Sequence, residues 1–370
     1  MIAARLPTRL AVACLAALSL TACNDDDDGG SEVVAYEVPT SYDGFANVSY
    51  TGQQARLAML GEMKALMRAA TGEPVDSARL SAMYANAEGA GFSREYPKQL
   101  RDKTLAAVAD DYEAYFGELA AASLANGQVA APGQAGVATS LDGEKAYLLD
   151  AAGVEWAQVI EKGLMGATLY YQAVGVYLAE EKMSADNEVV EPGEGTAMEH
   201  HFDEAFGYLG VPIGFPTDTE GAIFWGDYAV DRDADIDAVS RLGDAFLRGR
   251  AAIGAEAYDD RDAAIADIRE AWEEVVASTA IHYLNGALEE ADDPARRLHS
   301  LSEAVAFLYG LPFSPTTQLS RAEVAALLDT LAGASAFEDM DLYATTDEDI
   351  ESVRAEVARV YGWEGMAAQL

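Results

Sequence analysis

Apolar residues recur at intervals of three and four along almost the whole chain from Thr51 onward. This spacing places apolar side chains on one face of a helix, whereas a half-buried strand would show strict alternation. Alanine and leucine, both strong helix formers, are abundant in the same stretches. The pattern therefore predicts an all-α protein, and no part of it indicates a ladder of strands.

The helices expected from this pattern are bounded by capping and breaking residues. Thr51 and Gln54 have the spacing of a capping box and open a first helix that runs to about Arg68. The stretch 154–183 is the longest apolar-periodic segment and is expected to form a central, mostly buried helix. Further helices are expected from Asp76 and over 97–125, 194–209, 236–257, 260–291, 295–309, 320–332 and 347–361.

One string of residues occurs twice. EHHFDEAFGYLG, which begins at Glu199, returns as HSLSEAVAFLYGL, which begins at His299. When the two strings are aligned, His200 falls on His299 and Glu204 falls on Glu303. Each copy thus carries a histidine and a glutamate four residues apart, which lie side by side on one face of a helix.

The segments before the two strings also correspond, since each contains a Tyr-Leu step and an acidic end, VYLAEE in one and HYLNGALEE in the other. A long helix, a turn and a motif helix, used twice, predict two helical bundles related by pseudo-symmetry. We expect the first bundle over residues 51–210 and the second over residues 211–370.

The N-terminus predicts an exported lipoprotein. Arg5 and Arg9 form a basic start, the apolar stretch AVACLAALSL is too short to span a bilayer, and LTAC ends in Cys23. This order is that of a lipoprotein signal peptide over residues 1–22. Cleavage before Cys23 and acylation of its thiol and amine would anchor the product to a lipid bilayer.

Residues 23–50 are expected to form a flexible acidic tether, because Asp25–Asp28 and two glycines follow the acylated cysteine. Asn24 is not the Asp that retains many lipoproteins at the inner membrane. The expected location is therefore the cell envelope, lipid-anchored, with the outer membrane favoured over the inner one.

The charge of the chain restricts its partners. Its 63 acidic and 24 basic residues give a net charge of −39. Nucleic acid and anionic lipid are repelled by such a surface, whereas cations or cationic partners are attracted to it. A solubilising acidic surface that has no partner accounts for the same charge.

The four histidines all lie between residues 200 and 299, and acidic residues surround three of them. If the two motif helices pack about the pseudo-symmetry axis, imidazoles and carboxylates converge into a nitrogen and oxygen set suited to iron, zinc or manganese. The candidate metal ligands are Glu199, His200, His201, Asp203, Glu204, His299 and Glu303.

A structural role explains the same pairs, since a histidine and a glutamate on facing helices can hydrogen-bond and set the packing register. We leave both roles open for the first motif and favour the structural one for His299 and Glu303. His282, in an apolar helix, is expected to be a core residue. The chain has no HExxH, GxSxG or P-loop motif, so no catalytic residue is assigned.

The string HHFDEAFGYLG resembles the GxHxxE signature of imelysin-like proteins, with His201 and Glu204 in the His and Glu places and Glu199 in place of the Gly. The resemblance is closer to an uncharacterised helical lipoprotein branch, of the domain of unknown function 4856 type, which combines EHHFDEAFGYLG-like, KGLMGA-like and TGQQARLAMLGEM-like strings. It implies two four-helix-type bundles, an outer-membrane or periplasm-facing lipoprotein, and an association with iron uptake.

These observations lead to one expected function and two alternatives. The first is a non-catalytic envelope lipoprotein that binds a transition metal, above all iron, or an iron-bearing ligand, and either passes it to envelope uptake proteins or senses it. The second is a metal-dependent peptidase of imelysin type. The third is a structural or docking lipoprotein without a small ligand. The signature selects His201 and the repeat selects His200, so which of the two faces the site stays open.

Overall fold

The computed structural model describes residues 36–370. The predicted signal peptide, Cys23 and the acidic run Asp25–Asp28 lie outside the described residues. In the described part no helix is long and apolar enough to cross a membrane.

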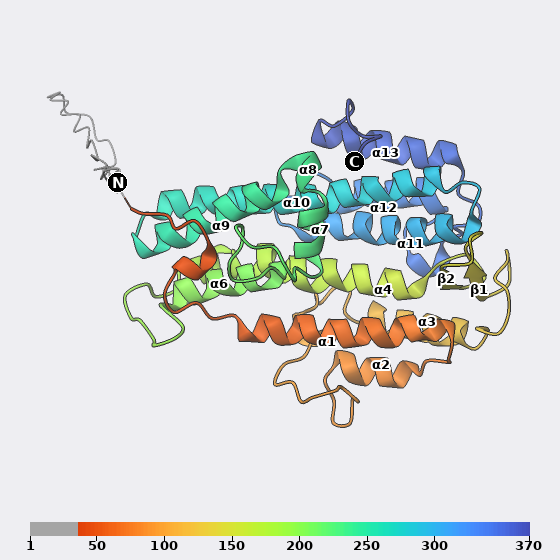
Figure 1. Ribbon diagram of the computed structural model, residues 1–370, viewed down its shortest axis with the longest axis horizontal. Coiled ribbons are helices and arrows are strands. Elements are labelled where there is room, and N and C mark those ends of the chain that lie inside the picture. Colours follow the sequence, from red (N-terminus) through yellow and green to blue (C-terminus); the bar gives the residue numbers. More distant parts are fainter. Residues whose placement is uncertain (1–35) are drawn as a thin grey trace, which may run out of the picture. The chain divides into compact units, whose positions relative to one another are not determined.

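Helices that run along a common long axis make up most of the described chain, which confirms the predicted all-α class (Figure 1). In chain order they are α1 (Thr51–Arg68), α2 (Ser77–Tyr84), α3 (Asp111–Ser123), α4 (Trp156–Leu164), a π-helical segment (Met165–Tyr177), α5 (Glu180–Met183), α6 (Ala197–Leu209), α7 (Trp225–Asp231), α8 (Asp233–Ile236), α9 (Ala238–Gly254), α10 (Tyr258–Glu289), α11 (Pro294–Gly310), α12 (Arg321–Ala332) and α13 (Asp347–Tyr361).

Two helix predictions differ from the structure. The helix expected over 97–125 exists only as α3, because the chain before it crosses the bundle and hydrogen-bonds elsewhere: the amide of Leu100 donates to Tyr84 and that of Leu105 donates to Ala167. The helix expected over 154–183 is central and buried, but it widens into the π-helical segment after α4.

A short hairpin was not expected. Strands β1 (Gly136–Thr139) and β2 (Ala146–Leu149) pair antiparallel, with Gly136 opposite Leu149. Each strand has four residues, which is too few for an alternating pattern to stand out in the sequence.

The flexible tether predicted through residue 50 is wrong for residues 36–50. Tyr42 is completely buried, its ring stacks on Phe206 with 3.7 Å between centroids, and its hydroxyl donates to Asp203 over 2.7 Å. Its backbone amide also donates to the carbonyl of Phe215. Burial of this aromatic side chain holds the segment against α6.

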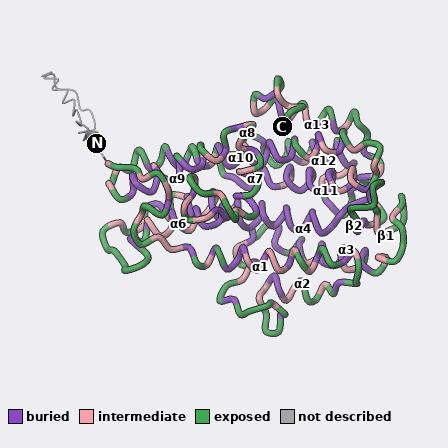
Figure 2. The backbone as a smooth tube through the Cα atoms, viewed as in Figure 1, coloured by how far each residue is buried: buried purple, intermediate pink, exposed green. Residues whose placement is uncertain are grey.

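Helices of the two predicted halves pack against one another. The longest helix, α10, packs along α9 and α11, while α11 also packs on α4 and α6 packs on α9 (Figure 1). Buried residues run along α4, α10 and α11 through the middle of the molecule (Figure 2). Residues 36–370 therefore share one hydrophobic core. The division into two pseudo-symmetric bundles between residues 210 and 211 stays a prediction from the repeated string.

Candidate functional site

The first motif occupies the opening turns of α6. Thr196 caps this helix through a capping box: its hydroxyl accepts from the Glu199 amide, and the Glu199 carboxylate accepts from the Thr196 amide. Gly210, in the left-handed region at φ 82°, ends the helix. The sequence EHHFDE is thereby held in helical register, which sets the directions of its side chains.

Both histidines of this motif lie beside Glu204. His201 Nδ1 is 3.3 Å from Glu204 Oε2, and His200 Nε2 is 4.0 Å from the same oxygen. The exposed fraction of the side chain is 22% for His201, 28% for His200 and 18% for Glu204. The signature and the repeat thus select two histidines of one cluster, of which His201 is the nearer to the carboxylate.

Glu204 is also contacted by uncharged side chains from other segments. The Gln53 amide on α1 donates to Glu204 Oε1 over 3.0 Å. Burial alone would raise the pKa of Glu204, but the hydrogen bonds of His201 and Gln53, the charge of His200 and the neighbouring Tyr177 hydroxyl lower it below its ordinary value. Glu204 is therefore ionised at neutral pH, and one of its carboxylate oxygens lies close to both imidazoles.

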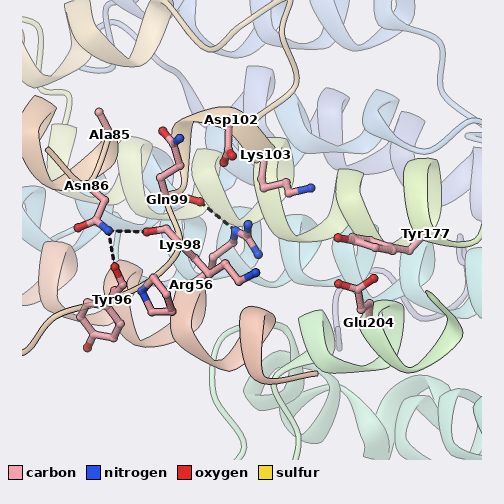
Figure 3. A pocket seen from close by; sticks show the side chains of 11 residues that line it. Arg56, Ala85, Asn86, Tyr96, Lys98, Gln99, Asp102, Lys103, Tyr177 and Glu204 are labelled. Carbon is pink, nitrogen blue, oxygen red and sulfur yellow. Dashed lines mark hydrogen bonds between the residues drawn. The ribbon is translucent and has the colours of Figure 1, made fainter. Parts of the chain in front are cut away.

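An open pocket of about 550 Å³ adjoins Glu204 (Figure 3). Glu204 and Tyr177 lie next to each other at one end of it, and the segment expected to be helical over 97–110 forms another wall. Burial and the neighbouring Arg56 lower the pKa of Lys103 in this wall. The lining residues are Arg56, Ala85, Asn86, Tyr96, Pro97, Lys98, Gln99, Asp102, Lys103, Tyr177 and Glu204.

Glu199 and Asp203 lie on another face of α6 and contact Arg250 of α9. Asp203, completely buried, accepts from Arg250 Nε over 2.9 Å, and Glu199 pairs with Arg250 Nη1. Burial raises the pKa of Asp203 to about 6, against the opposing effect of Arg250. These two candidate metal ligands are thus engaged in an ion-pair cluster that joins α6, α9 and the segment around Tyr42.

The second motif has a different set of neighbours. His299 Nδ1 is 2.6 Å from Glu155 Oε2, and the imidazole stacks on Tyr147 with 4.3 Å between centroids. Burial alone would lower the pKa of His299, but the hydrogen bond and charge of Glu155 and the charge of Glu303 raise it. His299 therefore joins α11 to the start of α4.

Glu303 belongs to a buried network of charges. Its Oε1 atom lies 3.8 Å from His299 Nε2 and 3.6 Å from the Lys162 ammonium, which in turn is 2.9 Å from Glu161. Burial would lower the pKa of Lys162, but Glu303 and Glu161 raise it. These charge pairs join α11 to α4. This is the packing role that we favoured for His299 and Glu303 from the sequence.

The predicted site shared by both motifs is not formed. Glu204 borders one pocket, whereas His299 and Glu303 border another, and helices α6 and α11 lie toward opposite ends of the long axis (Figure 1). Over residues 36–370 no three His, Cys, Asp or Glu side chains are grouped as they would be around a bound metal ion. His282, expected in the core, is exposed on α10.

Several residues that shape these sites were not singled out from the sequence: Gln53, Arg56, Glu155, Glu161, Tyr177 and Arg250. One signal was present, since Glu161 and Lys162 stand as adjacent opposite charges inside the apolar stretch WAQVIEKGLMGA. Adjacent charges in a buried helix indicate an ion-pair network, because an unpaired buried charge is costly.

A family model described as "Domain of unknown function (DUF4856)" matches residues 36–364. No curated protein and no solved structure matches the chain. The match covers nearly all of the described residues, including both motif helices and the segment around Tyr42.

Proposed function

The chain belongs to the DUF4856 family, and we propose that it is a lipid-anchored protein of the cell envelope that binds a transition metal ion at His201, Glu204 and His200. Two imidazoles and one carboxylate, with the remaining positions open, form a ligand set typical of ferrous iron, and zinc accepts the same donors. Iron is therefore the metal we expect first.

The spacing of His201 and Glu204 carries this proposal. Two ligands bonded to one ion at about 2.1 Å, with an angle of about 90–110° between them, lie about 3.0–3.4 Å apart. The 3.3 Å between His201 Nδ1 and Glu204 Oε2 falls in this range. His200 Nε2, at 4.0 Å, needs a small side-chain rotation to become the third ligand.

The surroundings of Glu204 suit metal binding as well. The lowered pKa of Glu204 keeps the carboxylate charged, which a metal ligand requires. The Gln53 amide hydrogen-bonds to the carboxylate and orients it, as neighbours of metal ligands commonly do, and Tyr177 lies next to it. The open pocket next to it leaves room for water or for a chelator that carries the metal.

The anchoring part of the proposal rests on residues outside the described range. The LTAC string ending in Cys23 supports acylation, which would place the metal site at the membrane surface, where cargo could pass to envelope uptake proteins. Labelling of the cells with a radioactive fatty acid tests it: label should enter the wild-type chain and be absent from Cys23→Ser.

The metal site is tested on the untagged full chain purified in detergent. After anaerobic loading and dialysis, we expect about one iron per chain by plasma mass spectrometry, and His201→Ala and Glu204→Gln should each weaken Fe²⁺ affinity at least about tenfold in calorimetry. His282→Ala is the matched control, since His282 is exposed and remote from Glu204 along the chain. The proposal is wrong if both site variants bind Fe²⁺ and Zn²⁺ as the wild type does.

A further inference from the structure

A second pocket, also of about 550 Å³, lies among α1, α4, α7, α11 and the hairpin. It is lined by four acidic and four basic side chains together with His299 and three tyrosines, in a chain whose acidic residues outnumber its basic ones by 63 to 24. Equal numbers of acidic and basic residues in this pocket do not follow from the average composition of so acidic a chain.

Three of the basic residues of this pocket are engaged with Glu161, which itself does not line the pocket. Glu161 Oε1 is 2.7 Å from Lys64 and 2.9 Å from Lys162, and its Oε2 is 3.4 Å from Arg68. Burial opposes ionisation of Glu161, but Lys162 and Lys64 lower its pKa. This carboxylate is fully compensated, so it leaves no demand for a ligand.

Glu303 is not compensated in the same way. It lines the pocket and is 97% buried, since its relative exposure is 3%. Its Oε1 atom is 3.6 Å from Lys162, beyond a good hydrogen bond, and its buried Oε2 accepts no hydrogen bond from any residue of the described range. A buried carboxylate without a close donor is costly, and a cationic N–H group that reaches Glu303 from the pocket would relieve that cost.

Four acidic residues line the pocket, two of them buried and two exposed. Glu303 and Glu155 are buried at the α11–α4 contact, and Asp227 and Asp231 of α7 lie at the exposed rim. Burial and the nearby charge of Asp231 raise the pKa of Asp227, against the opposing effect of Lys64 and Lys162. Tyr228 and Tyr283 also line the pocket, and aromatic faces attract cations.

Two basic residues of the pocket have donors to spare. The Arg68 side chain is 51% exposed and has one 3.4 Å contact, although a guanidinium offers five N–H groups. Lys145, at the hairpin, is exposed and lines the same pocket. Two basic groups with spare donors, in the same pocket as acidic and aromatic residues, fit a ligand that carries both charges.

We propose that this pocket binds a small amphoteric molecule of amino-acid type, whose ammonium pairs with the Glu303 carboxylate and whose carboxylate accepts from Arg68 and Lys145. A pocket of this volume suits a small polar ligand. The site is separate from the His201–Glu204 cluster and does not depend on metal binding there.

The test is calorimetry of the full chain in detergent with the twenty proteinogenic L-amino acids and alanyl-alanine. At least one should bind with a dissociation constant below about 1 mM. Propylamine and propionate, which each carry one of the two charges, should bind at least about tenfold more weakly than the best amino acid, because each loses one set of charge-assisted hydrogen bonds.

Variants assign the binding to this pocket. Glu303→Gln and Arg68→Gln should each weaken the best amino acid at least about tenfold. The matched controls Glu323→Gln and Arg359→Gln change exposed residues that do not line this pocket and should bind as the wild type does. His201→Ala should also bind as the wild type, which separates this inference from the metal proposal.

Three outcomes overturn the inference: no member of the panel binds, Glu303→Gln and Arg68→Gln bind unchanged, or propylamine binds as tightly as the best amino acid. Circular dichroism checks that each variant is folded. If Glu303→Gln does not fold, the exposed rim variants Asp227→Asn and Lys145→Gln replace it, and unchanged binding in both then counts against the inference.

Discussion

The two motif helices carry the same local pair in different surroundings. The histidine and glutamate nitrogen-to-oxygen distance is 4.0 Å for His200 and Glu204 in α6 and 3.8 Å for His299 and Glu303 in α11. The first glutamate keeps 18% of its side chain exposed, whereas the second keeps 4%. The helical spacing brings each histidine close to its glutamate. The neighbouring helices determine how much of the glutamate side chain stays exposed to a ligand.

The partners differ in charge. On helix α6, Glu204 accepts a hydrogen bond from the neutral Gln53 and lies next to Tyr177. Helix α11 meets α4, which brings the cation Lys162 and the carboxylate of Glu155. Charged partners make the second pair part of a buried ion-pair network, whereas the first pair borders an open pocket and stays more exposed. Four experiments test this contrast.

The largest effect is expected at Lys162. Lys162→Met leaves Glu161 and Glu303 buried without their shared cation, and breaking a buried ion pair in this way costs about 3–5 kcal/mol. Denaturant unfolding measures the loss, and the exposed Lys145→Met is the control, expected within about 0.5 kcal/mol of the wild type. A loss below about 1 kcal/mol for Lys162→Met would falsify the role of the network.

A somewhat smaller effect is expected on the buried face of the first motif. Arg250→Gln removes the partner of Asp203 and Glu199 and should cost about 2–4 kcal/mol, with residues 36–50 becoming sensitive to protease. Arg248→Gln on the same helix removes two exposed pairs and should cost less than about 1 kcal/mol. Equal losses in the two variants would mean that Asp203 does not hold this segment.

The pH dependence of stability distinguishes the second motif. The folded-state pKa of His299 is raised above its ordinary value of about 6.5, so the stabilisation from protonated His299 is fully present below about pH 6.5. It is lost as pH rises through the folded-state value. The difference in unfolding free energy between wild type and His299→Gln, on the order of 1 kcal/mol at pH 6, should therefore shrink toward pH 9. A difference that grows with pH contradicts the pairing with Glu155.

The smallest effect on stability is expected at the first motif's open face. His201→Ala should change the unfolding free energy by less than about 1 kcal/mol, because the side chain is partly exposed and its hydrogen bond to Glu204 is long. Thermal unfolding with and without Fe²⁺ measures this. The wild type should gain stability from the metal and the variant should not. A variant that still gains as much as the wild type argues against metal at His201.

Local patterns predicted the helices well where the periodicity is long and the ends are marked. Helix α1 begins at Thr51 and ends at Arg68 as predicted, although Thr51 forms no capping box, and Asp76 caps α2 through its side chain. The hairpin and the loop before α3 were missed because their hydrogen bonds join residues far apart in sequence or depend on very short strands. The π-helical segment also escaped, since its apolar pattern resembles that of an α-helix.

The candidate site was predicted in part. The sequence alone determined the helical class, the spacing of each His and Glu pair and the family, because these depend on residues close together in the chain. Only the tertiary structure decided that Asp203 and Glu199 pair with Arg250, that His299 pairs with Glu155, and that the two motifs do not meet. Those contacts join helices separated by about fifty residues or more, and which helix faces which follows from packing of the whole core rather than from local spacing.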